Sequence, residues 1–174
     1  MFKKILCLLF VIALTIAGIY GGRWYLSYRK QITGDQWFEK QQTYVDEMKT
    51  FGESMDKVVT LYLTKSIDQE DLLNHADTFN SSLIVMKRKY EQDKKDHPVR
   101  TGSYTYLTKK GCESVEKCYP ALSKMVYMLT DGNYYRDRDK LSYEYLACEQ
   151  PLIKNMSAYY SCKKLYNQQK KAKS

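Results

Sequence analysis

The sequence predicts an all-α protein: an N-terminal transmembrane helix, then an antiparallel bundle of about four helices that carries two disulfides. Three observations support this fold class. A long uncharged run begins at Ile5, directly after Lys3 and Lys4. The chain has only 8 Gly and 3 Pro in 174 residues, which is too few for a turn-rich β fold. Apolar residues in the rest of the chain recur at alternating steps of three and four, which indicates amphipathic helices.

Residues 1–25 are predicted to form a signal-anchor. The run Ile5–Tyr20 is uncharged, and Gly21 and Gly22 extend it toward the roughly 20 residues that cross a bilayer. Aromatic residues of the kind found at membrane interfaces follow it: Trp24, Tyr25 and Tyr28. The sequence Thr15-Ile16-Ala17, with Thr15 and Ala17 as its smaller residues, also fits a cleaved signal peptide, so cleavage stays open.

Beyond the anchor we expect a juxtamembrane linker at residues 26–34, a bundle at 35–167 and a basic tail at 168–174. The predicted location is a single pass through the inner membrane, with the bundle in the periplasm or extracellular space. Basic residues flank the apolar run on both sides, namely Lys3, Lys4, Arg23, Arg29 and Lys30. Their count weakly favours the opposite orientation. The predicted disulfides are the argument for an extracytoplasmic bundle.

The first bundle helix is predicted to follow a break at Gly34, with Asp35 as its N-cap, and to run to about Tyr62. Its apolar seam alternates steps of four and three, as in a coiled coil or a long bundle helix. The seam residues are Trp37, Gln41, Tyr44, Met48, Phe51, Met55, Val58 and Tyr62. We expect this seam to pack inside the bundle or against a partner helix.

The second helix is predicted to begin with a capping box formed by Ser66 and Gln69. It should end near Lys95, because Pro98 disfavours helical geometry at the residue before it. Its apolar positions again step by four and three: Leu72, Ala76, Phe79, Leu83, Met86 and Tyr90. The short connection makes it an antiparallel neighbour of the first helix.

The pattern over residues 100–110 does not settle whether this stretch is irregular or begins a third helix. Gly111 and Pro120 bracket residues 112–119, which we interpret as a non-helical insert. A helix is predicted from Pro120, at its first position, to about Thr130.

The last helix is predicted after a turn at residues 131–133, starting at residues 137–139 and running to about Tyr166. Its expected inner face comprises Leu141, Tyr145, Cys148, Leu152, Met156 and Tyr159. Pro151 is expected to kink or break this helix.

Four cysteines behind an export-type N-terminus predict two disulfides: Cys112, Cys118, Cys148 and Cys162. Zinc is disfavoured, because gaps of five and thirteen residues do not match the usual two to four. The nested pairing Cys112–Cys162 with Cys118–Cys148 is slightly favoured, since Cys118 and Cys148 are equidistant from the turn at Asn133. The sequential pairing Cys112–Cys118 with Cys148–Cys162 needs a full break at Pro151. Reduced thiols in a cytosolic bundle are the third alternative.

No catalytic, cofactor-binding or metal-binding residue is predicted. His75 and His97 are the only histidines, and both fit solvated positions. The chain contains no glycine-rich phosphate loop, no His-Glu-x-x-His and no Gly-x-Ser-x-Gly motif. Asp131, Asp137 and Asp139 alternate with basic residues and lack the spacing of a calcium loop.

The net charge of +8 fits an anionic partner surface, such as membrane lipid, envelope polymer or an acidic protein, and equally fits a charged surface that only keeps the protein in solution. No nucleic-acid-binding module is recognisable, so nucleic acid is not an expected partner. We expect a non-enzymatic, membrane-anchored structural or interaction subunit of a bacterial-type cell-envelope assembly, with a protein partner or second copy bound through the helical seam. The alternative is a ligand- or stress-sensing four-helix bundle that acts through a membrane partner. An apolar stripe left exposed after the bundle closes would favour the first hypothesis, and a buried polar cavity the second.

Overall fold

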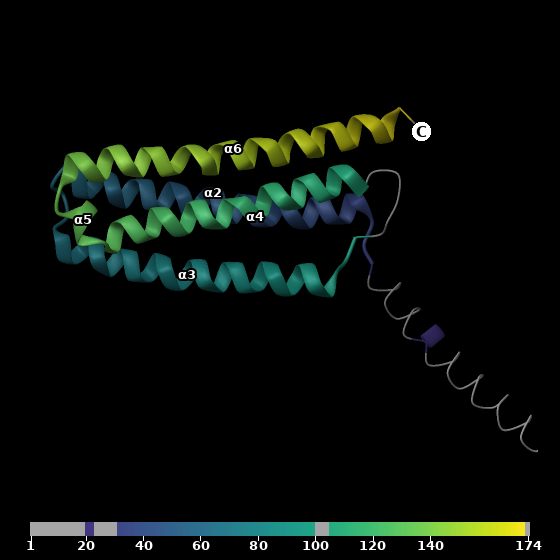
Figure 1. Ribbon diagram of the computed structural model, residues 1–174, viewed down its shortest axis with the longest axis horizontal. Coiled ribbons are helices and arrows are strands. Elements are labelled where there is room, and N and C mark those ends of the chain that lie inside the picture. The colour runs from purple at the N-terminus through teal and green to yellow at the C-terminus, as the bar shows by residue number, and fades with distance from the viewer. Residues whose placement is uncertain (1–19, 23–30, 100–104, 173–174) are drawn as a thin grey trace, which may run out of the picture.

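The computed structural model describes residues 20–22, 31–99 and 105–172 of the chain. Within residues 31–99 and 105–172 the chain folds into four long helices and one single-turn helix (Figure 1). Their bounds are α2 Gly34–Leu63, α3 Gln69–Asp96, α4 Thr105–Thr130, α5 Gly132–Tyr135 and α6 Arg138–Lys171. The predicted all-α class and the antiparallel bundle are therefore confirmed for this part of the chain.

The predicted anchor, residues 1–25, lies outside the described residues except for positions 20–22. In the part of the chain that the structure describes, no helix combines the length and apolar character needed to cross a membrane. The predicted linker is described only from residue 31. There Ile32 forms a single parallel bridge to Val99, with the Ile32 N–H donating to the Pro98 carbonyl at 3.0 Å.

Helix α4 is central to the bundle. It contacts α2, α3 and α6, whereas α3 and α6 lie on opposite sides (Figure 1). Because α2 and α4 also touch across the middle, α3 and α6 occupy the two outer corners. Buried residues on α3 are accordingly few: Leu72, Ala76, Leu83 and Tyr90. The corner position also leaves α6 with a broad exposed face.

Helix α2 begins slightly earlier than predicted, with Thr33 rather than Asp35 as its N-cap. The Thr33 side chain accepts from the Gln36 N–H at 3.3 Å, and the Gln36 side chain accepts from the Thr33 N–H at 3.0 Å. These reciprocal bonds form a capping box. Gly34 is the first helical residue rather than a break. A Cβ at Gly34 would lie 2.5 Å from the Tyr166 hydroxyl, so the glycine allows α6 to approach α2 closely.

The start of α3 also differs from the prediction, since Asp68 is the N-cap instead of Ser66. The Asp68 carboxylate accepts from the Asp71 N–H at 2.9 Å. Lys65 has a φ of 61°, so the chain reverses in the left-handed region just before this cap. The end of α3 at Asp96, two residues before Pro98, agrees with the predicted end near Lys95.

The predicted non-helical insert at residues 112–119 is wrong, because α4 runs continuously from Thr105 through Pro120 to Thr130. Pro120 removes one backbone hydrogen bond, to the carbonyl of Glu116. Packing of one continuous apolar face outweighs that loss. The buried face includes Leu107, Val115, Cys118, Leu122, Met125 and Leu129. Gly111 serves packing too, because a Cβ there would lie 3.2 Å from the Trp37 ring.

Helix α6 follows the short helix α5, which occupies the predicted turn. Asp137 caps α6 by accepting from the Lys140 N–H at 3.1 Å. The helix passes through Pro151 and continues to Lys171, so the predicted end at Tyr166 was too early and most of the basic tail is helical. An ion pair of 2.7 Å between Lys170 and Asp35 joins its last turn to the first turn of α2.

The predicted seam of α2 lies inside the bundle. All seven of its apolar residues are buried: Trp37, Tyr44, Met48, Phe51, Met55, Val58 and Tyr62. Buried tyrosine hydroxyls are satisfied across helices. Tyr159 donates to the Phe38 carbonyl at 2.7 Å, and Tyr145 donates to the Asp56 carboxylate at 2.8 Å. The core therefore uses tyrosine to fill space and to link helices at once.

Candidate functional site

All four predicted disulfide cysteines are free thiols, so the predicted two-disulfide framework is not formed in this structure. Continuous helices rule out the sequential pairing. Cys112 and Cys118 are six residues apart on α4, which is about 9 Å, and Cys148 and Cys162 are about 21 Å apart along α6. A disulfide needs Cα atoms within roughly 7 Å.

The nested pairing fails because the two helices do not align about Asn133. Asn155 donates to the Lys117 carbonyl at 3.3 Å, which places Cys118 opposite the middle of α6. Cys148 then lies about six residues, or roughly 9 Å, farther along the axis. Cys112 instead faces α3, where the Tyr90 hydroxyl lies 3.3 Å from its Sγ. Symmetry in the sequence misled the prediction, since α5 shifts the centre of the hairpin.

The environments of these thiols are those of structural residues. Burial raises the pKa of the Cys118 thiol to about 12, and this thiol donates to the Ser114 carbonyl at 3.4 Å. Burial also raises the pKa of Cys112 and of Cys162. Thiols with raised pKa values are poor nucleophiles at neutral pH.

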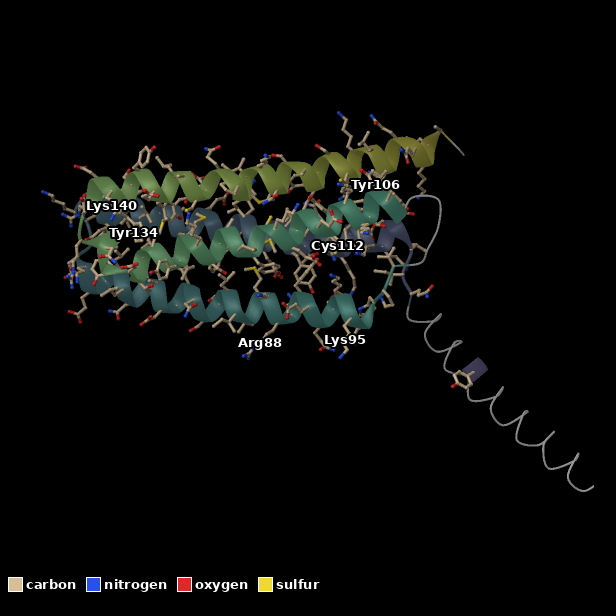
Figure 2. The ribbon with its side chains drawn as sticks, viewed as in Figure 1. Arg88, Lys95, Tyr106, Cys112, Tyr134 and Lys140 are labelled. Carbon is tan, nitrogen blue, oxygen red and sulfur yellow. The ribbon has the colours of Figure 1, made fainter. Side chains whose placement is uncertain are left out.

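A groove lies between the C-terminal half of α3 and the N-terminal half of α4. Figure 2 labels Lys95 on its α3 side and Cys112 on its α4 side. The groove contains two hollows with cavity volumes of about 520 and 560 Å³. Both hollows are lined by Lys94 and Glu116, which form an ion pair with each other. Aromatic and apolar walls are supplied by Trp37, Tyr90, Val99, Tyr119 and Pro120. Hollows of this size are typical of small-molecule sites.

A polar cluster of Lys40, Asp93 and His97 ties α2 to α3 beside this groove. The Asp93 carboxylate pairs with Lys40 and lies 2.9 Å from Nδ1 of His97, which in turn is 3.1 Å from the Lys40 ammonium. Burial alone would raise the pKa of Asp93, but the hydrogen bond and charge of Lys40, with His97, hold it below its usual value. The described residues contain no group of three or more His, Cys, Asp or Glu side chains arranged to hold a metal ion.

Helix α6 carries an apolar stripe that the closed bundle leaves exposed. Its members are Tyr143, Leu146, Ile153 and Tyr160, with exposed fractions of 75%, 55%, 43% and 40%. Leu146, Ile153 and Tyr160 are seven residues apart, so they lie on one side of the helix at intervals of about 10.5 Å. We call these four residues the α6 stripe.

The sequence prediction missed the α6 stripe, although a signal for it exists. Three apolar doublets recur at heptad spacing: Tyr145-Leu146, Leu152-Ile153 and Tyr159-Tyr160. The first member of each doublet is buried and the second is exposed. Adjacent helical residues point about 100° apart, so a single helix presents two apolar columns. The prediction assigned only the first column.

Comparisons with known proteins identify no matching family model, no similar curated protein and no similar solved structure. The residues described above therefore carry the functional inference. Two surfaces stand out among them, the α6 stripe and the α3–α4 groove.

Proposed function

We propose that this chain is a non-enzymatic, membrane-anchored interaction subunit of a bacterial-type cell-envelope assembly. The α6 stripe is the observation that carries the proposal. The uncharged run at residues 5–20, behind Lys3 and Lys4, supports a single-pass inner-membrane anchor with the bundle outside the cytoplasm. The disulfide argument for that compartment no longer applies, so the export-type N-terminus alone supports it.

The α6 stripe supports binding of a partner helix. Heptad spacing lets a second helix run along α6 with its side chains set between Leu146, Ile153 and Tyr160. Burying the remaining exposed part of Leu146 or Ile153 would contribute about 1 kcal/mol each. The expected partner seam on α2 is occupied by the chain's own core, so the proposal places the partner surface on α6.

A second copy of the chain is the partner that α6 fits best. Leu146 and Tyr160 are equidistant from Ile153, so two antiparallel α6 helices can pair with Ile153 on a two-fold axis. The first half of α6 carries Asp139, Glu144 and Glu149 together with Arg138 and Lys140, and the second half carries Lys154, Lys163, Lys164, Lys170 and Lys171 with no acidic residue. An antiparallel pair therefore sets a weakly acidic half against a strongly basic half.

The test is photo-cross-linking of the full chain in detergent micelles, with a photoreactive amino acid in place of Ile153. We expect a cross-linked dimer that disappears in the Leu146→Glu variant. The matched control is Val85→Glu on α3, another solvent-facing aliphatic residue, 63% exposed against 55% for Leu146, which should leave the dimer intact. No cross-link to any protein would contradict an interaction subunit. A cross-link only to another protein would contradict self-pairing and retain the partner surface.

A second candidate function, ligand sensing, is favoured by the α3–α4 groove. Trp37 lines one hollow and is one of two tryptophans in the chain. In a Trp24→Phe background, Trp37 fluorescence reports on that hollow alone. Saturable quenching by the amphipathic anion anilinonaphthalene sulfonate would support a ligand site if it is lost in Thr108→Phe, which narrows the hollow without adding a tryptophan. Unsaturable quenching would contradict it.

A further inference from the structure

Charge is segregated along the axis of the bundle. One end of the bundle contains the start of α2, the end of α3, the start of α4 and the end of α6 (Figure 1). We call it the terminal end, and we call the opposite end the loop end. The terminal half comprises residues 34–48, 86–97, 105–119 and 154–172. In it, the number of Lys and Arg residues exceeds the number of Asp and Glu residues by five. In the loop half, residues 49–85 and 120–153, Asp and Glu exceed Lys and Arg by four.

Within the terminal half, α6 has the largest positive excess, α3 and α4 have smaller ones, and α2 is net acidic. Residues 154–172 of the chain contain five lysines and no acidic residue. We define the basic face as Lys109 and Lys110 on α4 together with Lys163 and Lys164 on α6. The two pairs are neighbours, since the charge of Lys110 acts on the thiol of Cys162, which precedes Lys163.

The basic face is available to an external anion. Among the described residues, the ion pairs of the terminal half involve other lysines: Lys40, Lys87, Lys89, Lys94 and Lys170. Lys163 donates only to the neutral Gln42 side chain, at 3.1 Å. A hollow of about 380 Å³ beside it is lined by Tyr160, Lys163, Lys164, Asn167, Gln168 and Lys171, none of them acidic. Tyr106, 68% exposed, lies at the same end (Figure 2), with the Lys110 ammonium 5.7 Å from its ring.

The terminal end is also where the chain arrives from the apolar N-terminal run. The hydrogen bond from the Ile32 N–H to the Pro98 carbonyl holds the start of the described chain at this end. Ten residues, 21–30, separate the run from Gln31 and can span at most about 35 Å. Three of these ten are basic: Arg23, Arg29 and Lys30. With an anchor at residues 5–20, the basic end of the bundle would be the end nearest to the bilayer.

We propose that the terminal end docks, through the basic face, on anionic lipid headgroups of the membrane that holds the anchor. This inference rests on the proposed anchor. Each lysine near an anionic surface strengthens membrane association by about fivefold, and the attraction acts within a Debye length of roughly 8–10 Å. The acidic loop end is repelled by the same surface. The bundle would then stand with its axis away from the membrane, and the α6 stripe would face sideways toward a partner helix. Two copies docked this way in one membrane would meet with their α6 helices parallel, so this docking excludes the antiparallel self-pair for chains in the same membrane.

The experiment is lysine acetylation with acetic anhydride, read by mass spectrometry, on the full chain in phosphatidylcholine vesicles with or without phosphatidylglycerol. We expect severalfold protection of the basic face only in the anionic vesicles. The loop-end lysines Lys49, Lys57 and Lys65 should react equally in both. Molar salt should remove the protection, because it shortens the Debye length to about 3 Å.

A fourfold variant with glutamine at each position of the basic face should lose the anionic-vesicle protection of Lys170 and Lys171. Its matched control replaces Lys49, Lys57, Lys65 and Lys124 with glutamine, which changes the net charge equally and should keep that protection. Circular dichroism checks that both variants remain helical.

The outcomes separate this inference from the anchor. A chain that fails to float with vesicles overturns the anchor and the docking together. A chain that floats, but is acetylated equally in both vesicles, overturns the docking alone. Protection that appears only when an anionic polysaccharide is added to neutral vesicles overturns lipid as the partner in favour of an envelope polymer.

Discussion

Replacing Pro120 with alanine tests whether α4 is one continuous helix. Proline inside a helix is less favourable than alanine by about 3 kcal/mol, because it lacks the N–H and crowds the preceding turn. Pro120 is exposed, so its ring contributes little to the core. Alanine restores the bond to the Glu116 carbonyl but makes the unfolded chain more flexible, which costs about 0.4–1 kcal/mol. We expect a net stabilisation of about 2 kcal/mol.

The assay is thermal unfolding of the full chain in mild detergent, followed by circular dichroism at the helical minimum. A stabilisation of about 2 kcal/mol corresponds to a rise in Tm of roughly 4–8 °C for a protein of this size. Pro151→Ala should act in the same direction, because Pro151 lies inside α6 and is also exposed. Pro98→Ala is the control. Pro98 lies between α3 and α4 and only accepts a bond through its carbonyl, so no stabilisation is expected.

An unchanged or lower Tm for Pro120→Ala would refute the continuous α4. In that case Pro120 would occupy the first position of a helix, where its missing N–H has no partner to lose. That result would restore the non-helical insert that the sequence favours. A rise with Pro151→Ala alone would confine the disagreement to α4.

Three further predictions concern the core, the polar cluster and the thiols. Phe51→Ala should destabilise the bundle by about 3–5 kcal/mol, because Phe51 is 8% exposed and packs edge-to-face on Phe79. A Tm equal to that of the unmodified chain would place the Phe51 ring in solvent. The pKa of Asp93 is lowered in the folded state, so its stabilising effect is full above about pH 3.9 and is lost as the pH falls through the folded pKa. Asp93→Asn should therefore flatten the fall in Tm with acidification, and an unaltered pH profile would contradict the role of the Lys40–Asp93 pair. The thiols of Cys112, Cys118, Cys148 and Cys162 should all react with an alkylating reagent under non-reducing conditions once the chain is denatured. Cys118 should react only after denaturation, because it is fully buried. Peptides joined by a disulfide would contradict the register of α4 and α6.

The existence and direction of α2 and α3 could be predicted from sequence because each has a single apolar face. Their N-terminal boundaries could not be fixed in the same way. Thr33 and Asp35 both have side chains that can cap α2, and Ser66 and Asp68 both can cap α3. Only the hydrogen-bond geometry selects Thr33 and Asp68, so the sequence leaves an ambiguity of about two residues at each start.

The error in α4 came from giving local rules more weight than the tertiary pattern. Gly111 and Pro120 are helix-breaking signals when each is taken alone. The apolar positions 107, 111, 115, 118, 122, 125 and 129 nevertheless step by three and four through both residues. Gly111 is explained by the Trp37 ring packed against it, which is a contact with another helix and has no local signature. The disulfide prediction failed with it, since the assumed extended segment between Cys112 and Cys118 is helical.

The candidate site on α6 depends on where that helix sits in the bundle, which its own sequence does not contain. Its apolar doublets show two columns about 100° apart. A helix enclosed by neighbours would bury both columns, and the pattern would then indicate core. Because α6 occupies an outer corner, opposite α3, it buries Tyr145, Leu152 and Tyr159 and leaves the second column to solvent. The same position exposes the lysines of its second half. One helix thus carries both the apolar stripe that we propose for a neighbouring subunit and the basic end that we propose for a membrane, while α2 and α4 form the core that keeps both surfaces in place.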